Sequence, residues 1–373
     1  MRRIPCRWVL ALMTTAAALM TIALASCSSG VMPSNVSPHA SGSPHMSPTG
    51  SAAPGATGGS VFGTVQNNPA MTQTPAGLYL STYPGQPGQA PPATTLERLS
   101  GATGRVTSRH DFGPGYLSPP VAGAGSLWVT IANNQGESLD RLNPVTLATT
   151  GQVLLTSKQA ALYAGETWNR VTFAGDAVWV AAVDQFYRVS PGSLKVTSTV
   201  PFPGADSSTI GASSDGHVLV LSEAEQGVGA IERHEPVTGA KQASHPMTGV
   251  VAARVSGVTD TGVWITEPTG MLGYVERFTA AGLTPQPATE VKGTNGIRAM
   301  LADGSLWITS PVGGARMNYC ADPTTGHRRA QIPLPNPAQD YLLAVGPDEI
   351  YYTVPAQNGS RLERAPVPAA CRA

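Results

Sequence analysis

Charged side chains are scarce in this chain. Asp, Glu, Lys and Arg make up 12% of its 373 residues, and lysine occurs at only four positions: Lys158, Lys195, Lys241 and Lys292. The formal net charge is zero, and no segment gathers the arginines into a basic patch. That composition excludes the electrostatic surface typical of nucleic-acid-binding proteins, so we expect no nucleic-acid partner.

The sequence motifs of several enzyme classes are also missing. There is no His/Cys cluster with zinc spacing, no acidic EF-hand loop, no glycine-rich phosphate loop and no G-x-S-x-G elbow. The tryptophan-docking repeat of quinone-dependent propellers is not recognisable either. We therefore expect neither a metal site nor a cofactor.

Long apolar runs are confined to the N-terminus. Three arginines (Arg2, Arg3 and Arg7) precede an apolar run from Trp8 to Leu24, which is the arrangement of a secretion signal. The run ends in the sequence LASC, which resembles a bacterial lipobox. The resemblance implies that Cys27 is lipidated, as in palmitoylated lipoproteins, and anchors the protein on the outer face of the cell membrane. The alternative is an ordinary cleaved signal peptide with a chance cysteine.

The segment after Cys27 has no apolar periodicity. It consists mainly of Ser, Pro, Gly, Ala and Thr with almost no charge, so it cannot form a core. We expect three parts: a lipoprotein signal peptide (1–26), a lipidated cysteine with a disordered tether (27–60), and a folded domain (61–373).

What the folded domain has in abundance is glycine (41 in the chain) and proline (33), together with one strand pattern that recurs. The recurring strand resembles GSLWVT and occupies 77–82, 125–130, 177–182, 217–222, 262–267, 304–309 and 348–353. Its central residues are Tyr79, Trp128, Trp179, Leu219, Trp264, Trp307 and Tyr351. A second signature, typified by LDRLNPVT, follows each copy and places an arginine at one position in six copies: Arg98, Arg141, Arg188, Arg233, Arg277 and Arg364. Cys320 takes that position in the remaining copy.

The two signatures recur in phase, and the central residues of successive copies are 40 to 51 residues apart. This period indicates repeats of about four strands each. Seven such copies predict an all-β fold, a seven-bladed β-propeller of four-stranded antiparallel blades. The strand and its R-x-(N/D)-P-x-T-G turn resemble the NHL, YVTN and streptogramin-lyase-like propeller superfamily. We interpret the central aromatics as core, with a ligand-stacking role as the alternative. We interpret the repeated arginines as structural partners of a turn carbonyl or of an acid in a neighbouring blade.

The ends of the domain should meet. The last copy stops after its third strand, and the segment SVFGTVQ (60–66) could supply the missing fourth strand. Once Cys6 leaves with the signal and Cys27 carries lipid, Cys320 and Cys371 remain in neighbouring copies. In an oxidising compartment such a pair predicts a disulfide.

In a propeller, the loops between the second and third strands and between blades surround one mouth of the channel. Arg170 and Arg298 stand nine residues before the tryptophan of their copy and Arg254 stands ten before, so all three could point into that mouth. With Trp168 and Asn295 they form a candidate ligand-binding set for an anionic or sugar-like ligand. The alternative is that each arginine is paired with Glu223, Glu225, Glu267 or a carbonyl and only lines the channel.

We expect an exported, lipid-anchored binding or interaction platform at the cell envelope. Its partner would be an envelope protein, a wall glycan or a small anionic ligand. The alternative is a propeller enzyme of streptogramin-lyase-like or hydrolytic type with its site at the channel mouth. For that chemistry the candidate residues are His245, expected in a loop, with Glu223 and Glu225.

Overall fold

The structure is a computed structural model that describes residues 60–65, 70–82, 93–157, 170–182, 185–202, 207–213, 215–223, 228–248, 253–269, 272–286, 297–312, 315–332, 334, 341–356 and 359–372. The predicted signal peptide, Cys27 and the tether up to residue 59 lie outside these residues. No helix within the described ranges is long and apolar enough to cross a membrane.

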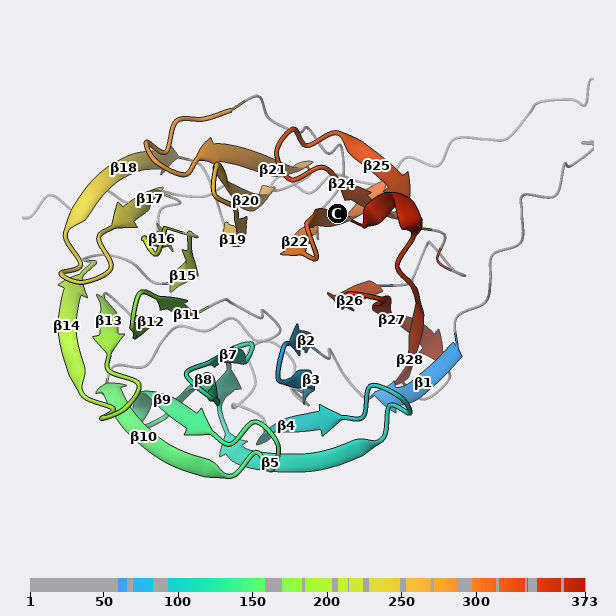
Figure 1. Ribbon diagram of the computed structural model, residues 1–373, viewed down its shortest axis with the longest axis horizontal. Helices are drawn as coiled ribbons and strands as arrows, with labels where there is room; N and C mark the ends of the chain where they lie inside the picture. The colour runs from blue at the N-terminus through green and yellow to red at the C-terminus, as the bar shows by residue number, and fades with distance from the viewer. Residues whose placement is uncertain are drawn as a thin grey trace, which may run out of the picture. The chain divides into compact units, whose positions relative to one another are not determined.

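The strands of the described residues form seven antiparallel sheets, arranged around a central axis as the blades of a propeller (Figure 1). This confirms the predicted all-β, seven-bladed fold. Blade 1 holds β2 (Ala70–Thr74), β3 (Gly77–Thr82), β4 (Ala93–Leu99) and β5 (Val106–Pro114). Blade 2 holds β6 (Tyr116–Leu117), β7 (Val121–Gly123), β8 (Ser126–Asn133), β9 (Gly136–Leu142) and β10 (Thr149–Thr156), with β6 and β7 both paired to β8. Blade 3 holds β11 (Val171–Ala174), β12 (Ala177–Ala182), β13 (Gln185–Val189) and β14 (Val196–Pro201).

The remaining blades follow the same order from the axis outward. Blade 4 holds β15 (Ser207–Ala212), β16 (Val218–Glu223), β17 (Val228–His234) and β18 (Lys241–Thr248). Blade 5 holds β19 (Arg254–Val258), β20 (Gly262–Thr269) and β21 (Leu272–Thr279), with a bridge from Phe278 to Pro285 on the outer side. Blade 6 holds β22 (Arg298–Ala302), β23 (Ser305–Val312), β24 (Ala315–Ala321) and β25 (Arg328–Gln331). Blade 7 holds β26 (Tyr341–Val345), β27 (Glu349–Ala356), β28 (Gly359–Pro366) and β1 (Ser60–Val65), followed by the 3-10 helix η1 (Ala369–Cys371).

The turns between third and fourth strands share one conformation. In each, the backbone N–H of the fifth residue donates to the carbonyl of the first, as from Leu147 to Asn143 at 2.9 Å. The fifth residue has a positive φ, 60° at Leu147 and 69° at Gly104. Blade 1 needs glycine at this point, because a Cβ on Gly104 would lie 1.8 Å from the carbonyl oxygen of Phe62 in β1.

The hydrophobic core is divided among the junctions between blades. Seven clusters of buried residues occur in the described part of the chain, one at each junction. The central residue of each second strand belongs to the cluster shared with the next blade, and the four central tryptophans are at most 1% exposed. Burying each one contributes roughly 2–3 kcal/mol of transfer free energy. The interpretation of these residues as core is confirmed.

A hydrogen bond also crosses each junction on the face that carries the turns. The donors and accepting carbonyl oxygens are Tyr79 to Pro144, Arg141 to Pro191, Arg188 to Pro236, Arg233 to Ala281, Trp264 to Pro323, Ser305 to Cys371 and Arg364 to Gly101, at 2.6–3.2 Å. Four of the seven donors are repeat arginines, each reaching a turn or loop of the next blade. Their predicted structural role is therefore confirmed, although the acids they contact, such as Asp176 and Asp215, belong to their own blade.

The ring closes where the two ends of the domain meet. Strand β1 pairs with β28 as the outer strand of blade 7, with Thr64 opposite Arg361. In Figure 1 the blue β1 and the red β28 lie side by side. The predicted disulfide is present between Cys320 of β24 and Cys371 of η1, with Cα atoms 5.7 Å apart, and it joins blade 6 to the end of blade 7.

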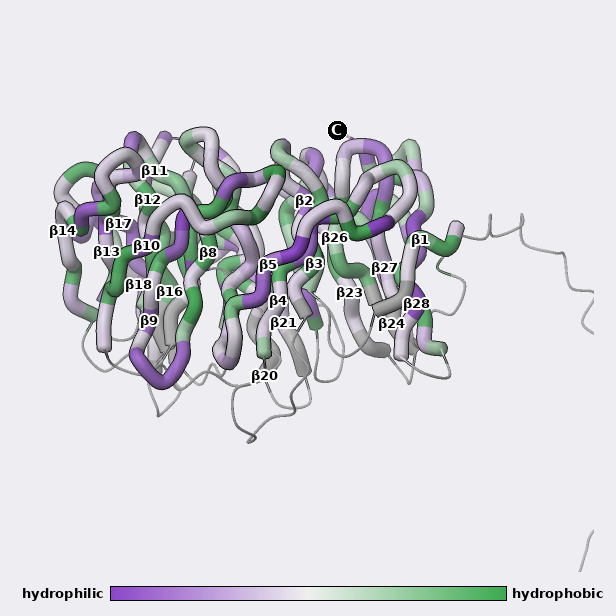
Figure 2. The backbone as a smooth tube through the Cα atoms, turned by 90° about the horizontal axis from the view of Figure 1, so that it is seen from below, coloured by the Kyte–Doolittle hydropathy of each residue, from purple (hydrophilic) through white to green (hydrophobic). Residues whose placement is uncertain are grey.

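Figure 2 views the blades from the side and shows their strands running between two faces, with the C-terminus at the upper one. We call this upper face, which carries the turns between first and second and between third and fourth strands, the turn face. The opposite ends of the inner strands, where β19 and β22 begin, lie toward the other face. This distinction positions the sites described below.

Candidate functional site

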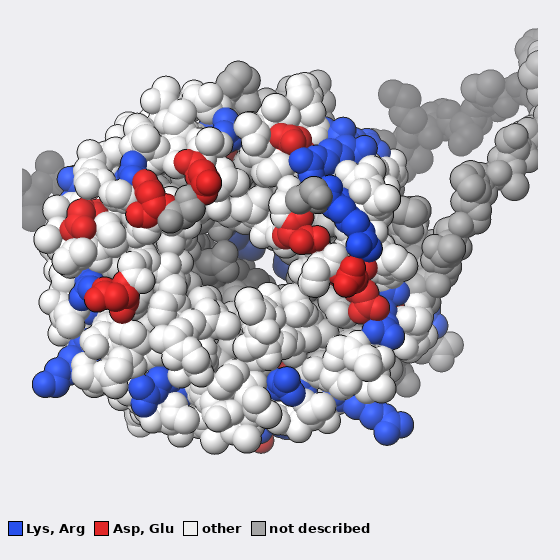
Figure 3. Space-filling view, viewed as in Figure 1, with Lys and Arg blue, Asp and Glu red and all other residues white. Residues whose placement is uncertain are grey.

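The central channel contains a cavity of about 310 Å³. The cavity is lined by inner strands β2, β19, β22 and β26 together with the segment from Pro119 to Val121. Figure 3, viewed onto the turn face, shows a central opening with basic side chains inside it. Among the lining residues, Arg254 and Arg298 carry positive charge.

These two arginines occupy equivalent positions on neighbouring blades. Arg254 pairs with Thr266, and Arg298 pairs with Thr309, in each case two residues beyond the central tryptophan. A β-bulge between Val255 and Gly257 adds one residue to β19, which explains why the sequence spacing is ten in blade 5 and nine in blade 6. The structure thus places two of the three predicted arginines in one cavity.

Arg170 has the same register but a different environment. Its carbonyl accepts the backbone N–H of Ala181, which again lies two residues beyond the central tryptophan. The side chain is 4% exposed, and its Nη1 donates to both carboxylate oxygens of Glu137, at 2.8 and 2.9 Å. Glu137 is fully buried in β9. Arg170 therefore joins blade 3 to blade 2 through a buried ion pair, and it is not among the residues that line the channel cavity.

Glu137 is the residue that sequence reasoning missed. The sequence suggests Glu223, Glu225 or Glu267 as partners of the three arginines, whereas the partner of Arg170 comes from the preceding blade. The local sequence carries no apolar context that marks this glutamate as buried, because it stands between Gly136 and Ser138 where the third strand of that repeat begins. A buried carboxylate requires a partner, and the start of the next inner strand supplies it.

Several predicted site residues lie outside the described residues. Trp168, Asn295 and Glu225 are among these, and for Glu223 the structure describes the strand end but not the side chain. The proposed contacts of these four side chains remain predictions.

His245 lies elsewhere than we expected. The prediction of a loop position is wrong, because His245 is within β18, the outermost strand of blade 4, opposite Ile231. Its ring lies 5.2 Å from that of Phe278 in blade 5. The partly apolar sequence SHPMT extends the strand because alternate side chains pack on the neighbouring blade. His245 therefore stands at the rim and not at the channel mouth.

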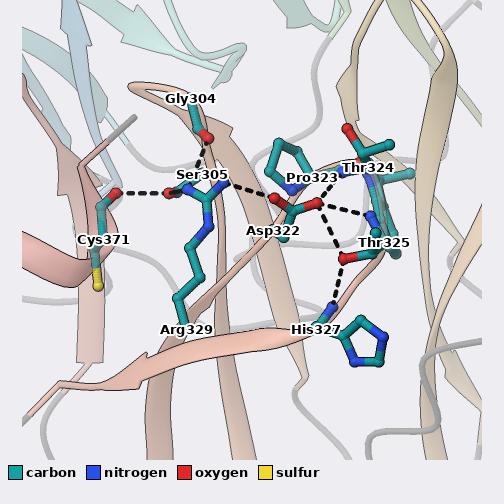
Figure 4. Close-up of polar contacts among 10 residues, drawn as sticks. Gly304, Ser305, Asp322, Pro323, Thr324, Thr325, His327, Arg329 and Cys371 are labelled. Carbon is teal, nitrogen blue, oxygen red and sulfur yellow. Dashed lines mark hydrogen bonds and ion pairs between the residues drawn. The ribbon is translucent and has the colours of Figure 1, made fainter.

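A cluster of polar contacts lies at the blade 6–7 junction (Figure 4). The Asp322 carboxylate accepts the backbone N–H groups of Thr324 and Thr325, at 2.9 and 2.8 Å, and a bond from Arg329 at 2.7 Å. The hydrogen bond from the Thr325 backbone, together with that from Arg329, lowers the pKa of Asp322 to about 2. These contacts order a turn and a junction, and no group of three or more His, Cys, Asp or Glu side chains suited to a metal ion occurs in the described part of the chain.

Comparisons with known proteins extend this picture only at the level of fold. No known protein family matches the sequence, and no curated protein matches it. A chain of the hydrazine synthase from Kuenenia stuttgartiensis is similar in structure, with a TM-score of 0.57 and 12% identity over 83% of this chain and 99% of that one. BamB from Moraxella catarrhalis gives a TM-score of 0.47 and 12% identity, over 83% and 91% of the two chains. A puromycin-hydrolyzing peptidase from Mycobacterium tuberculosis gives 0.49 and 14%, over 82% of this chain and 52% of that one. At 12% identity the hydrazine synthase chain is related to this one by fold alone, and this chain is a seven-bladed β-propeller.

Proposed function

We propose that this chain is an exported, lipid-anchored propeller of the NHL, YVTN and streptogramin-lyase-like superfamily that serves as a binding platform at the cell envelope. Its channel takes a small anionic ligand. The observation that carries the proposal is the placement of Arg254 and Arg298 at equivalent positions of adjacent blades, both lining one cavity.

The chemistry of the cavity favours a small oxyanion. A guanidinium presents a rigid fork of N–H donors that matches a carboxylate, sulfate or phosphate group. Ser256 and Thr266, whose hydroxyls contact each other, also line the cavity and offer further hydrogen bonds. The volume of about 310 Å³ is at the small end of ligand pockets, so a sugar acid or an inorganic anion fits better than a polymer.

The proposed location rests on two features. The arginine-flanked apolar run that ends at Cys27 has the pattern of a lipoprotein signal. The disulfide between Cys320 and Cys371 is of the kind that persists in extracytoplasmic compartments. Together they support anchoring on the outer face of the membrane, with the propeller outside.

Binding is tested by calorimetric titration of the full chain with glucuronate and with inorganic phosphate. We expect saturable binding of at least one probe and a loss of tenfold or more in affinity for Arg254→Ala and for Arg298→Ala. The matched control is Arg105→Ala, an exposed arginine in the third-to-fourth-strand turn of blade 1, which should bind like the wild type. Affinity unchanged in both channel variants, or no binding of either probe, contradicts the proposal.

Anchoring is tested separately by growing cells that express the chain with radiolabelled palmitate. The wild-type chain should take up label and sediment with membranes, whereas Cys27→Ser should remain unlabelled. A labelled Cys27→Ser variant would overturn the assignment of the anchor.

A further inference from the structure

Arg98 differs from the other repeat arginines in what it contacts. The other five each donate to an acceptor in their own blade: Arg141 to Thr150, Arg188 to Asp176, Arg233 to Asp215, Arg277 to Thr261 and Arg364 to Glu349. Arg98 instead hydrogen-bonds to the Tyr79 hydroxyl, and its Nε, like that of Arg233 and Arg277, is buried without a hydrogen-bond partner in the described part of the chain. Three residues before the central position, where blade 3 has Asp176, blade 1 has Ala76.

The junction of blades 1 and 2 also does not depend on Arg98. The Tyr79 hydroxyl donates to the carbonyl oxygen of Pro144 at 2.8 Å, which is the bond that arginines make at four other junctions. Arg98 thus contacts the Tyr79 hydroxyl of its own blade, and the hydrogen bond that crosses to blade 2 comes from Tyr79 and not from the guanidinium.

Arg98 instead lines a groove of about 680 Å³ between blades 7 and 1 on the turn face. One wall is formed by blade 1 with Gly77, Ser100 and Gly101, and the other by blade 7 with Asp348 and Glu349. A Cβ on Gly77 would lie 3.2 Å from the Nε of Arg98, so the glycine leaves room for the guanidinium to lie against the backbone. The groove has the size of sites that hold small molecules.

The two walls carry opposite charge. The Asp348 side chain is 78% exposed, and its one ion pair in the described residues is with Arg372, at 3.1 Å. An exposed pair of this kind contributes about 0–1 kcal/mol, so Asp348 can exchange Arg372 for a ligand cation at little cost. Glu349 is already held by Arg364 at 3.0 Å and by the Tyr351 hydroxyl. The groove therefore offers the guanidinium of Arg98 on one wall and, on the other, the carboxylate of Asp348, whose exposed partner a ligand cation can displace. This pairing suits a ligand that carries both signs.

We propose that this groove binds a small zwitterion, a free α-amino acid or the end of a short peptide. The carboxylate lies on Arg98 and the ammonium group lies against Asp348. The site belongs to the turn face and shares no residue with the arginine pair of the channel, so it stands independently of the proposed channel function.

The test uses calorimetric titration of the full chain with dialanine. We expect saturable binding that falls at least tenfold in Arg98→Gln and falls also for N-acetylalanine, which lacks the ammonium group. Asp348→Asn, on the exposed wall, should weaken the binding of dialanine and leave the binding of N-acetylalanine unchanged. This variant keeps the test decisive if Arg98→Gln folds poorly. Arg141→Gln, the equivalent arginine of blade 2, and the double variant Arg254→Ala/Arg298→Ala should bind dialanine as the wild type does.

Four results would overturn the proposal. The first is an absence of saturable dialanine binding. The second is equal affinity in the wild type and in folded Arg98→Gln, or, where Arg98→Gln does not fold, in Asp348→Asn. The third is inorganic phosphate binding at Arg98 as tightly as dialanine. Loss of dialanine binding in the channel double variant would place the ligand in the channel instead and would equally reject the groove.

Discussion

Trp307 lies directly opposite Cys320 in blade 6, at the register where every other blade pairs its central residue with an arginine. The exception has a structural reason. Blade 7 receives its outer strand from the N-terminal end of the domain, so no third-to-fourth-strand turn follows β28. An arginine in blade 6 would therefore find no turn carbonyl across the junction.

The chain end takes over the function of that turn. After β28, helix η1 brings Cys371 against blade 6, where its sulfur bonds to Cys320 and its carbonyl oxygen accepts a hydrogen bond from the Ser305 hydroxyl at 2.6 Å. Figure 4 shows Arg329 donating to the same hydroxyl, at 2.8 Å. A covalent bond thus replaces the arginine contact at the one junction that lacks a turn.

The disulfide should be a principal source of stability. It closes a separation of 51 residues, and removing such a cross-link costs about 2–4 kcal/mol, mainly because the unfolded chain gains freedom. We expect Cys320→Ala/Cys371→Ala to lower the free energy of unfolding in urea by that amount. Wild-type protein unfolded in the presence of a reductant should match the double variant, and the variant itself should not respond to reductant. Equal stability of the two proteins without reductant would contradict this role.

The ion pair between Arg170 and Glu137 should be structural. Both side chains are at most 4% exposed, and replacing one partner leaves an uncompensated buried charge that costs about 3–5 kcal/mol. We expect Arg170→Met and Glu137→Leu each to destabilise the propeller strongly. The double variant should recover much of the loss because no charge remains buried. A double-mutant cycle of unfolding free energies measures this coupling, and additive losses would show that the pair is not coupled.

The strand that closes the ring offers a test with two adjacent residues. Phe62 is 4% exposed and packs on Tyr351, with ring centroids 5.4 Å apart, whereas Val61 is 62% exposed. Phe62→Ala should lower the free energy of unfolding by about 3–5 kcal/mol. Val61→Ala, one residue away, should change it by at most about 0.5 kcal/mol. Similar effects of the two substitutions would mean that β1 is not packed into blade 7.

The turn at Asp322 should make stability fall in acid. Its pKa is about 2 in the folded protein against an ordinary value of 3.8, so the folded state favours the ionised form. The resulting stabilisation is complete above the unfolded pKa and is lost as pH falls from about 4 toward 2. Asp322→Asn should flatten that part of the stability profile, measured by urea unfolding at a series of pH values.

A reciprocal variant serves as its control. Asn143 makes the same turn in blade 2, where its side-chain oxygen accepts the backbone N–H groups of Val145 and Thr146 at 2.8 and 3.0 Å. Asn143→Asp should therefore add an acid-sensitive contribution where the wild type has none. An unaltered acid profile in both variants would mean that these turns do not contribute to the pH dependence.

The repeat signatures were sufficient to predict the architecture. Each repeat contains a large apolar residue in a short strand, in most copies an arginine at a fixed distance, and a glycine or proline turn. These features recur because every blade must bury one side against the next, and the residues that do so lie close together in the sequence. The closing strand and the disulfide could also be predicted. The last repeat lacks a fourth strand that the segment before the first repeat can supply, and Cys320 and Cys371 are the two cysteines that remain in the folded domain.

The sequence by itself determined the number of blades, the central residue of each blade and the pairing of the two ends of the domain. Only the tertiary structure decided which two arginines line the channel, which one is buried against Glu137 and which one lines the groove that Asp348 also lines. Arg170, Arg254 and Arg298 share one register, and Arg98 carries the same signature as the other repeat arginines. Their environments differ because each depends on the side chains of the neighbouring blade. Such contacts join residues tens of positions apart, so no local pattern records them, and they are fixed only when the ring closes.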